Sequence, residues 1–481
     1  MDLSKKIGLF LSPIAFLLML ALPPQFGLKP DAWHVLALGI LMLGWWVTEA
    51  LPLPVTSLVP LVVLPLMGIS QPKEVGAFYG DPIVFLFLGG FMLALAMEKW
   101  NLHRRIALTI VSWTGTNANG IVLGFMVSTA VMSMWISNTA TTIMMLPIAL
   151  SVISLLTENS MADAPASQKK GMANFSKTIM LGIAYSASLG GMATLIGTPP
   201  NVVFKAYMLK NGYQVDFFGW MMVGVPLTIL LVLLTYFVNV KLIFPNRLGK
   251  FDGAKELIES ELNSLGKPSK AEKRIFWLFM ATVLLWVSSG FLNNLVPGLK
   301  LSDEMIAIAA AIVLFLIPVD RKNGSYLLDW DATAKLPWGI LLLFGGGLAL
   351  ADALYKTGLI DLIGSVFQGS HINRVLFVLA LTAATVLLSE VMSNVALVVV
   401  FLPVVSGIAQ AVGIEPILLA VPMTLAASCG FMLPMATPPN AIVFGGGHLK
   451  IADMVRAGFW LDILSILAIT LLAVTLVVWV F

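Results

Sequence analysis

Four short polar motifs decide how this chain is interpreted: SNT at 137–139, TPPN at 198–201, SNV at 393–395 and TPPN at 437–440. Each lies inside a mostly apolar stretch. Polar side chains and helix-breaking prolines are costly in hydrocarbon unless protein or water surrounds them. Polar breaks that recur at matching places in two halves therefore predict a central binding site within a membrane protein.

The composition predicts an all-α polytopic membrane protein. Of 481 residues, 59% are hydrophobic and only 11% are charged. Apolar runs near the length that spans roughly 30 Å of hydrocarbon recur along the chain, for example at 225–240, 275–291 and 461–481. The first such run follows Lys5 and Lys6 and lacks a small-residue cleavage site. We therefore interpret it as a membrane helix rather than a signal peptide.

The distribution of basic residues predicts the orientation of the chain. We expect about eleven membrane-spanning helices and two re-entrant hairpins, with the N-terminus in the cytoplasm. Most of the 28 Lys and Arg then fall in cytoplasmic segments, including the soluble linker that joins the two halves. The net charge of +3 is explained by this bias, so no nucleic-acid partner is expected.

The two halves align as an internal repeat. A single shift of 256 residues superposes four features of the first half on the second, namely Gly89-Gly90 on Gly345-Gly346, Ser133 on Ser389, Ser137-Asn138 on Ser393-Asn394, and Pro147 on Pro403. The later TPPN motifs follow at different spacings, and we assign the extra residues of the first half to a polar loop at 158–177, because insertions belong in loops. The predicted division is a first helix in 1–30, one repeat in 31–244, a cytoplasmic linker in 245–272 and a second repeat in 273–481.

The spacing also predicts how the motifs enter the membrane. Five crossings lie between the two Ser-Asn motifs, an odd number, so the repeats should be inverted. The segments 121–150 and 375–409 are each long enough for two short helices with a polar tip, as in a re-entrant hairpin. The segments around Thr198 and Thr437 are interpreted as spans broken at Thr-Pro-Pro, because proline removes an amide donor and disfavours helix at the preceding residue.

The chemistry of the four breaks suits a small anion together with a cation. Freed backbone carbonyls suit Na⁺, and helix N-termini attract anions. The amides of Asn138 and Asn394 can serve both, and Thr139, Thr198 and Thr437 add hydroxyls. Such residues also act as interhelical contacts in membranes, but four motifs in register favour a site. The motifs contain no Lys, Arg or carboxylate, which favours sodium coupling over proton coupling.

One acid interrupts the second hairpin. Glu390 lies beside Ser389, where the first half has Met134. An acid inside a membrane is a functional candidate, and it could equally be a hydrogen-bonded support of the hairpin. No pattern resembles a nucleophile with its base, paired catalytic carboxylates or a metal-binding histidine set, so the chain is not predicted to be an enzyme.

At these motifs the chain resembles the divalent anion/sodium symporter family of di- and tricarboxylate transporters. The stretches WWVTEALPLPVTSLVPL (45–61) and GDPIVFLFLGGF (80–91) are similar to its bacterial members in particular. The resemblance covers essentially the whole chain. It implies an elevator-type homodimer in the bacterial inner (cytoplasmic) membrane, with a scaffold domain and a transport domain in each protomer.

The resemblance also implies site residues. One sodium site would use Ser133, Ser137, Asn138 and Gly197, and a second would use Ser389, Met392, Asn394 and Ala436. Substrate would contact both hairpin tips and both broken helices, through Asn138, Thr139, Thr198, Pro199, Asn394, Val395, Thr437 and Pro438. Val395 is a departure, since dicarboxylate carriers of the family often have Thr there, and the lost hydroxyl leaves the choice between succinate-like and citrate-like substrates open.

These observations together predict a secondary active transporter that imports C4-dicarboxylates such as succinate, fumarate or malate, driven by co-transported Na⁺. The alternative is a sodium-independent exchanger of the same fold for dicarboxylates or citrate. A membrane-embedded enzyme would need a catalytic constellation that the sequence lacks. A passive channel would show a continuous pore lining rather than a site closed by two hairpins.

Overall fold

The computed structural model describes residues 3–115, 117–158, 165–248, 252–320, 324–367 and 373–481. The first half contains α1 (Leu3–Ala21), α2 (Pro30–Thr48), α3 (Leu53–Thr56), α4 (Val59–Leu66), α5 (Pro72–Ala77), η1 (Phe78–Gly80), α6 (Pro82–Lys99), α7 (Leu102–Trp113), α8 (Ala118–Ser133), α9 (Asn138–Glu158), α10 (Ala166–Gly191), α11 (Pro199–Lys210), α12 (Phe217–Tyr236) and the π-helix η2 (Phe237–Ile243). The second half contains α13 (Asp252–Ser264), α14 (Lys270–Leu295), α15 (Asp303–Leu316), β1 (Pro318–Asp320), β2 (Ser325–Tyr326), η3 (Trp330–Lys335), α16 (Trp338–Lys356), α17 (Leu359–Ser365), α18 (Arg374–Ser389), α19 (Asn394–Ala411), α20 (Ile417–Ala426), α21 (Pro438–Gly445), α22 (Ile451–Val474) and α23 (Leu476–Val480).

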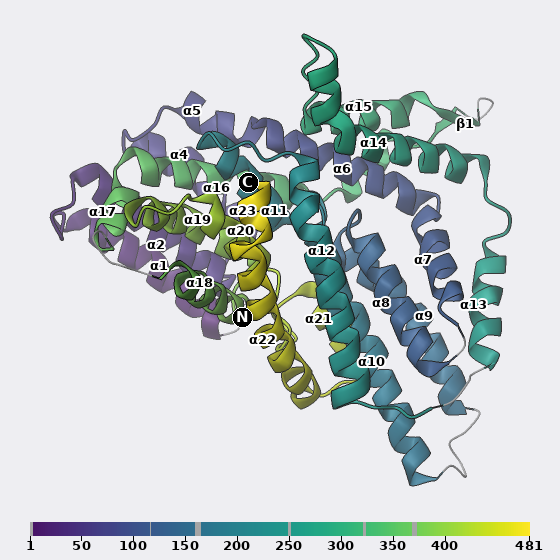
Figure 1. Cartoon of the computed structure of the whole chain (residues 1–481). Coiled ribbons are helices and arrows are strands. Elements are labelled where there is room, and N and C mark those ends of the chain that lie inside the picture. The colour runs from purple at the N-terminus through teal and green to yellow at the C-terminus, as the bar shows by residue number, and fades with distance from the viewer. Residues whose placement is uncertain (1–2, 116, 159–164, 249–251, 321–323, 368–372) are drawn as a thin grey trace.

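The prediction of a helical, multi-pass membrane protein is confirmed (Figure 1). Nine helices of the described ranges are long and apolar enough to cross a membrane. The count of eleven crossings and two re-entrant hairpins stays a prediction. A departure from the all-α prediction is small: β1 and β2 form a two-stranded antiparallel pair.

The helices repeat with the same shift as the motifs. α8 and α18 begin and end 256 residues apart, at Ala118–Ser133 and Arg374–Ser389. The helices that follow, α9 and α19, begin at Asn138 and Asn394. Duplication is therefore visible in the elements themselves, while the inversion of the repeats across the membrane stays a prediction.

The polar loop predicted at 158–177 is wrong in its second part. Within it, α10 already begins at Ala166 and continues to Gly191. Ala, Gln and Lys dominate its first turns, and these residues favour helix even where they are polar. The extra residues of the first half therefore include a helical extension of α10.

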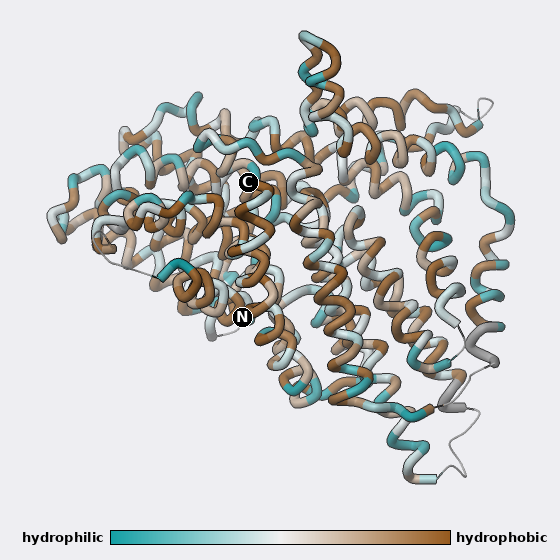
Figure 2. Tube along the Cα trace, viewed as in Figure 1, coloured by the Kyte–Doolittle hydropathy of each residue, from teal (hydrophilic) through white to brown (hydrophobic). Residues whose placement is uncertain are grey.

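Two groups of helices can be distinguished by their contacts, and α19 joins them because it packs against α16 and α17. In one group α10 packs against α8, α9, α12 and α21, and α22 packs against α12, α18 and α20. In the other group α6 packs on α15, and α16 packs on α2, α3 and α4. Figure 2 shows hydrophobic residues along most of α12 and α22, as expected for helices that face lipid.

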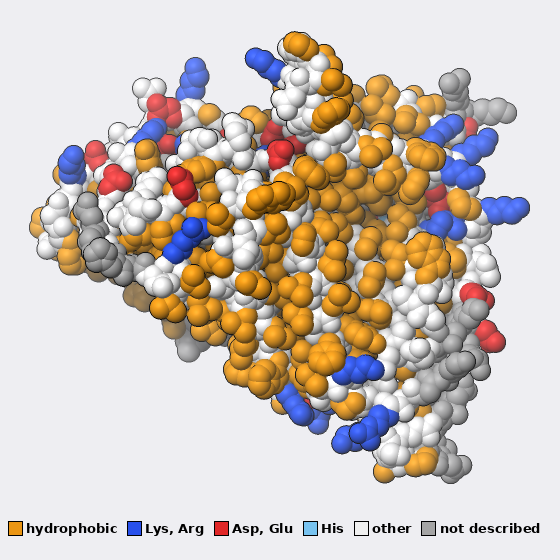
Figure 3. All heavy atoms as spheres, in the orientation of Figure 1, with side chains coloured by type: hydrophobic (Ala, Val, Ile, Leu, Met, Phe, Trp, Pro, Cys, Tyr) orange, Lys and Arg blue, Asp and Glu red, His pale blue; other side chains and the backbone are white. Residues whose placement is uncertain are grey.

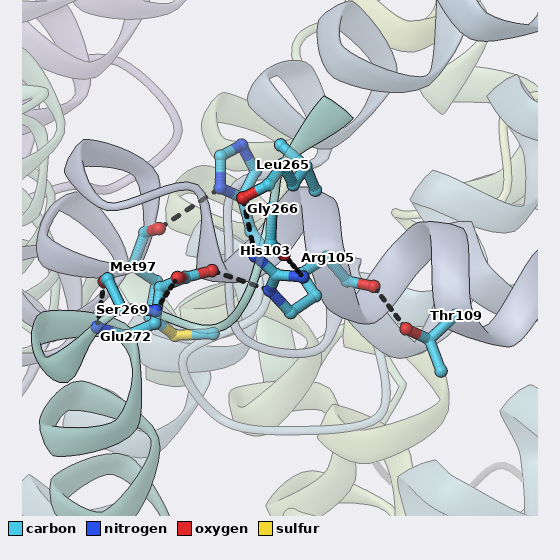
Figure 4. Close-up of polar contacts among 8 residues, drawn as sticks. All are labelled: Met97, His103, Arg105, Thr109, Leu265, Gly266, Ser269 and Glu272. Carbon is cyan, nitrogen blue, oxygen red and sulfur yellow. Dashed lines mark hydrogen bonds and ion pairs between the residues drawn. The ribbon is translucent and has the colours of Figure 1, made fainter. Parts of the chain in front are cut away.

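The linker between the halves is held against α7 (Figure 4). Arg105 donates to Glu272 at 2.7 Å and to the carbonyl oxygens of Gly266 and Leu265 at 3.0 and 3.1 Å. Arg104 forms an ion pair with Glu261 of α13. A planar guanidinium presents several donors in a fixed geometry, which suits it to hold a loop by three bonds.

Candidate functional site

The two hairpin tips are short turns between helices whose ends match in both halves. In the first half four residues, 134–137, connect α8 to α9, and in the second half residues 390–393 connect α18 to α19. Ser137 caps α9, because its hydroxyl accepts from the backbone N–H of Ala140 at 3.2 Å. Both α9 and α19 therefore begin at the Asn of their motif.

The two Thr-Pro-Pro-Asn motifs restart helices after a break. Thr198 and Thr437 are both extended, with φ near −146° and −141°, and each precedes two prolines in the first helical turn. Proline suits that turn, because the first amides of a helix have no intrahelical acceptor and its φ is already helical. The motifs thus fix where α11 and α21 begin.

The Asn of each motif closes the break in the same way. The Asn201 amide donates to the carbonyl oxygens of Gly191 and Thr194, at 3.1 and 2.8 Å. The Asn440 amide donates to Gly430 and Leu433, at 3.1 and 3.0 Å. Both side chains are fully buried. These amides supply partners for carbonyl groups that the interrupted helices leave free, a requirement of any buried backbone.

Four helix N-termini meet at one cavity of about 610 Å³. It is lined by the starts of α9, α11, α19 and α21, together with parts of α1, α2, α6 and α16. All eight residues predicted to contact substrate line it: Asn138, Thr139, Thr198, Pro199, Asn394, Val395, Thr437 and Pro438. Helix N-termini carry partial positive charge and free N–H groups, so this cavity suits an anion.

The first predicted cation site brings oxygens together behind the first tip. The Ser133 hydroxyl lies 2.6 Å from Asn138 Oδ1 and 2.7 Å from the carbonyl oxygen of Ala187. Only the hydroxyl has a proton to share among these three oxygens. Gly191 makes the approach possible, because a Cβ there would lie 2.5 Å from Asn138 Oδ1. Ser137 and Gly197 line the cavity on the same side.

The second predicted cation site is arranged differently. The Ser389 hydroxyl donates within its own helix to Val386, at 2.8 Å, and does not contact the Asn of its motif. Asn394 Oδ1 is buried without a hydrogen-bond partner. Met392 and Ala436 line the cavity, whereas Ser389 and Ser133 are fully buried behind it. An unpartnered buried oxygen is costly unless something else binds it.

Glu390 supports the second break. Its two carboxylate oxygens accept from the backbone N–H groups of Met432 and Leu433, at 2.8 and 2.9 Å. The side chain is almost entirely buried, and a second buried acid, Asp462 of α22, is its neighbour. Glu390 therefore ties the hairpin tip to the break between α20 and α21, as expected for the support role.

Sequence reasoning missed the part of the cavity that comes from the first two helices. Lys5 and Glu49 line it, and their charged groups lie 3.9 Å apart. From the sequence, membrane orientation alone accounts for Lys5. Glu49 lies in a positive-φ conformation at the end of α2. An acid within an otherwise apolar segment was the signal that could have identified it.

A buried ion cluster links a broken helix to the other helix group. Lys205 of α11 lies 2.5 Å from Asp303 and 3.3 Å from Glu304, both of α15. Lys205 and Asp303 are only 3% and 5% exposed. Charges so deeply buried need a partner, since an unpaired one costs several kcal/mol. The cluster therefore fixes α11 against α15 in this conformation.

Two hairpin tips and two interrupted helices around a shared cavity are the architecture of a membrane transporter rather than of an enzyme. The chain belongs to the family described as "Sodium:sulfate symporter transmembrane region", whose model matches residues 3–481. This confirms the family resemblance inferred from the motifs.

Two relatives are similar over nearly the full chain. The sodium-dependent dicarboxylate transporter SdcS of Staphylococcus saprophyticus subsp. saprophyticus is 39% identical over 482 residues, covering 99% of this chain and 92% of the relative. SdcS of Staphylococcus aureus (strain USA300) is 40% identical over 469 residues, covering 97% and 90%.

Two solved structures share the fold at low sequence identity. The YdaH transporter of Alcanivorax borkumensis superposes with a TM-score of 0.57 and 14% identity, covering 93% of this chain and 98% of that one. MtrF of Neisseria gonorrhoeae, described within a class of antimetabolite efflux pumps, gives 0.51 and 12%, covering 98% and 94%. These similarities concern the fold alone.

Proposed function

We propose that this protein is a sodium-coupled secondary active transporter that imports C4-dicarboxylates such as succinate, fumarate or malate. The observation that carries the proposal is the convergence of four helix N-termini on the cavity of about 610 Å³. A dicarboxylate has two anionic ends, and paired N-termini from the two repeats offer N–H donors to both. The amides of Asn138 and Asn394, one from each tip, add further donors.

Sodium coupling is supported by the oxygens around the two tips. The Ser133 hydroxyl lies within 2.7 Å of both Asn138 Oδ1 and the Ala187 carbonyl oxygen. Asn394 Oδ1 has no hydrogen-bond partner. Oxygen ligands from carbonyls, amides and hydroxyls suit hard cations. The relatives named above are sodium-dependent dicarboxylate transporters. Bound Na⁺ would also offset the charge of the substrate in a cavity whose motifs have no basic side chain.

An elevator mechanism in a homodimer belongs to the same proposal. The group α8–α12 with α18–α23 would carry the site past a scaffold made of α1–α7 and α14–α17. The cavity includes Lys5, at the end of α1 that the basic residues predict to be cytoplasmic, so this conformation would face inward.

The deciding experiment is uptake of radiolabelled succinate into proteoliposomes, with an empty or succinate-loaded lumen and an inward Na⁺ or K⁺ gradient. We expect accumulation in empty vesicles that requires Na⁺. Uptake that requires internal succinate and ignores Na⁺ would establish the exchanger instead, and both sodium sites would be wrong. Size-exclusion chromatography with light scattering tests the homodimer on the same preparation.

A disulfide tests the elevator. Gly90 of α6 lies against Ile196 of the first break, and a Cβ on Gly90 would be 3.6 Å from the Ile196 Cβ. That separation suits a disulfide, and the native Cys429 is buried. Oxidised Gly90→Cys/Ile196→Cys protein should lose transport and regain it on reduction, whereas each single variant should not respond. Undiminished transport by the cross-linked protein would exclude sliding between these two groups.

A further inference from the structure

A second cavity lies apart from the candidate functional site. It has a volume of about 770 Å³ and lies between the start of α10, the segment that follows η2, and the start of α22. Four basic side chains line it, Lys170, Lys177, Arg247 and Arg456, against a single acid, Asp453. The net charge of its lining is therefore +3, which attracts anions.

The acid of this cavity is already engaged. One oxygen of Asp453 accepts from Lys177 Nζ at 2.6 Å, and the other accepts from the backbone N–H of Lys450 at 3.1 Å, where it caps α22. The remaining cations, Lys170, Arg247 and Arg456, are exposed and have no acidic partner in the described parts of the chain. Three positive charges are thus free to bind a ligand.

The wall that carries Arg247 is fixed in place. Asn174 donates to the carbonyl oxygen of Pro245 at 2.9 Å, and Asn246 donates to Asn119 Oδ1 at 2.9 Å. Gly171 lets α10 approach, because a Cβ there would lie 2.3 Å from the Asn246 carbonyl oxygen. The segment that carries Arg247 is therefore held against α8 and α10.

The backbone conformation of Arg247 is unusual. Its φ is +50°, in the left-handed region that residues with a side chain seldom adopt. Such strain persists where surrounding contacts impose it, and it is concentrated at binding sites. Here Arg247 lies in the held segment and lines the cavity.

The cavity opens where the apolar surface of the protein ends. Leu242 of η2 and Ile451 and Phe459 of α22 are about half or more exposed. Figure 3 shows Lys and Arg side chains gathered along the lower edge of the hydrophobic face to which α12 and α22 contribute. A ligand here can place an anionic group among the basic side chains and apolar chains along the two helices.

We propose that this cavity binds a phosphate group, and that its source is the headgroup of an anionic phospholipid. Arginine presents paired donors that match phosphate oxygens. Basic pockets at the cytoplasmic side of membrane helices bind such headgroups. The site lies on α10, η2 and α22. α10 leads into the first break and α22 packs against α20, so bound lipid would brace these helices.

The test uses the full chain purified in detergent. One variant combines Lys170→Gln, Arg247→Gln and Arg456→Gln. Its matched control combines Lys6→Gln, Lys267→Gln and Lys273→Gln, which removes the same charge from exposed lysines outside the cavity. Native mass spectrometry then measures retained phosphatidylglycerol against phosphatidylcholine. The preference for phosphatidylglycerol should fall roughly tenfold to a hundredfold in the cavity variant and stay unchanged in the control.

A second arm distinguishes a lipid from a soluble ion. The apparent Tm is measured with and without inorganic phosphate for the same three proteins. Stabilisation of wild type and control but not of the cavity variant, without lipid preference, would support the site and assign it to free phosphate. Equal behaviour of the cavity variant and the control in both arms would overturn the proposal. If the triple variant does not purify as a single species, Arg456→Gln alone replaces it in both measurements.

Discussion

The two repeats bind each hairpin tip to its break with opposite chemistry. In the first half the side chain belongs to the break: the Thr194 hydroxyl donates to the Met134 carbonyl oxygen of the tip, at 2.5 Å. In the second half the side chain belongs to the tip: Glu390 accepts from two backbone N–H groups of the break. Glu390 occupies the repeat position of Met134, and Leu433 that of Thr194. What the fold requires is partners for the freed backbone groups, and either direction supplies them.

The largest expected effect comes from the Asn of each tip. Asn138→Ala and Asn394→Ala should each abolish uptake, because both residues line the cavity and, in the proposed function, their amides bind substrate and cation. Asn138→Ala should lower the Tm more than Asn394→Ala. Asn138 Oδ1 accepts a hydrogen bond from Ser133, whereas Asn394 Oδ1 has no partner to lose. Uptake assays with Tm measurements check both statements, and near-normal transport by either variant would remove that Asn from the site.

Glu390→Ala should destabilise the protein more than Thr194→Val. The first leaves the part-buried N–H groups of Met432 and Leu433 without their charged acceptor, at roughly 1–3 kcal/mol each. The second removes the donor to the Met134 carbonyl oxygen. The Gly197 N–H loses its bond to the Thr194 hydroxyl at 3.1 Å but keeps its bond to the Thr194 carbonyl oxygen at 3.4 Å. Glu390→Gln should fall between them. Thermal unfolding of the purified variants measures both losses of stability. A larger loss for Thr194→Val than for Glu390→Ala would contradict this prediction.

The Asn residues of the two breaks should behave alike. Asn201→Ala and Asn440→Ala each remove two hydrogen bonds of matching geometry, worth on the order of 1 kcal/mol apiece. Their losses of unfolding free energy should therefore agree within the error of denaturation in detergent. Asn201→Asp and Asn440→Asp keep the shape and remove the amide donors, so they should reproduce most of the effect. If the two variants lose clearly different amounts of unfolding free energy, hydrogen bonds of the same geometry contribute differently in the two halves.

The smallest effect is expected where the cavity itself is asymmetric. Thr139 of the first tip faces the cavity with a hydroxyl, whereas Val395 of the second does not. Val395→Thr should shift preference from citrate toward dicarboxylates by about fivefold, the equivalent of one hydrogen bond. Competition of unlabelled citrate against succinate uptake measures the shift, with Val395→Ala as the control for altered shape. An unchanged profile would show that this position is not selective.

Local chemistry explains why the tips and breaks could be predicted. Two prolines after an extended Thr favour a helix start, so the Thr-Pro-Pro-Asn motifs located α11 and α21. Ser before Asn is a typical helix cap, so the Ser-Asn motifs located α9 and α19. The start of α10 was missed because polar residues near Lys170 resembled a loop, although their helix propensity is high. The repeat shift likewise predicted equivalent helices but not the different bonds of Thr194 and Glu390.

Contacts between distant segments could not be read from the sequence. Lys5 and Glu49 line the cavity together with the two tips. Glu49 is an acid in an apolar segment, which marks it as a candidate, but the sequence does not show which distant residues it lies beside. The pairing of Lys205 with Asp303 joins residues 98 apart. Both depend on how helices are arranged in space, which hydrophobic periodicity does not determine.

The three bonds that Arg105 makes around the linker bear on the continuity of the chain (Figure 4). The linker is held to α7 both at its helix, α13, and at its end before α14. The two halves can therefore stay together without a continuous peptide chain through the linker. The halves also interlock elsewhere, since α21 packs on α10 and α19 on α11. A gene split between the codons of α12 and α14 should therefore yield two polypeptides that assemble in one membrane, which makes each repeat separately accessible to labelling and directed evolution.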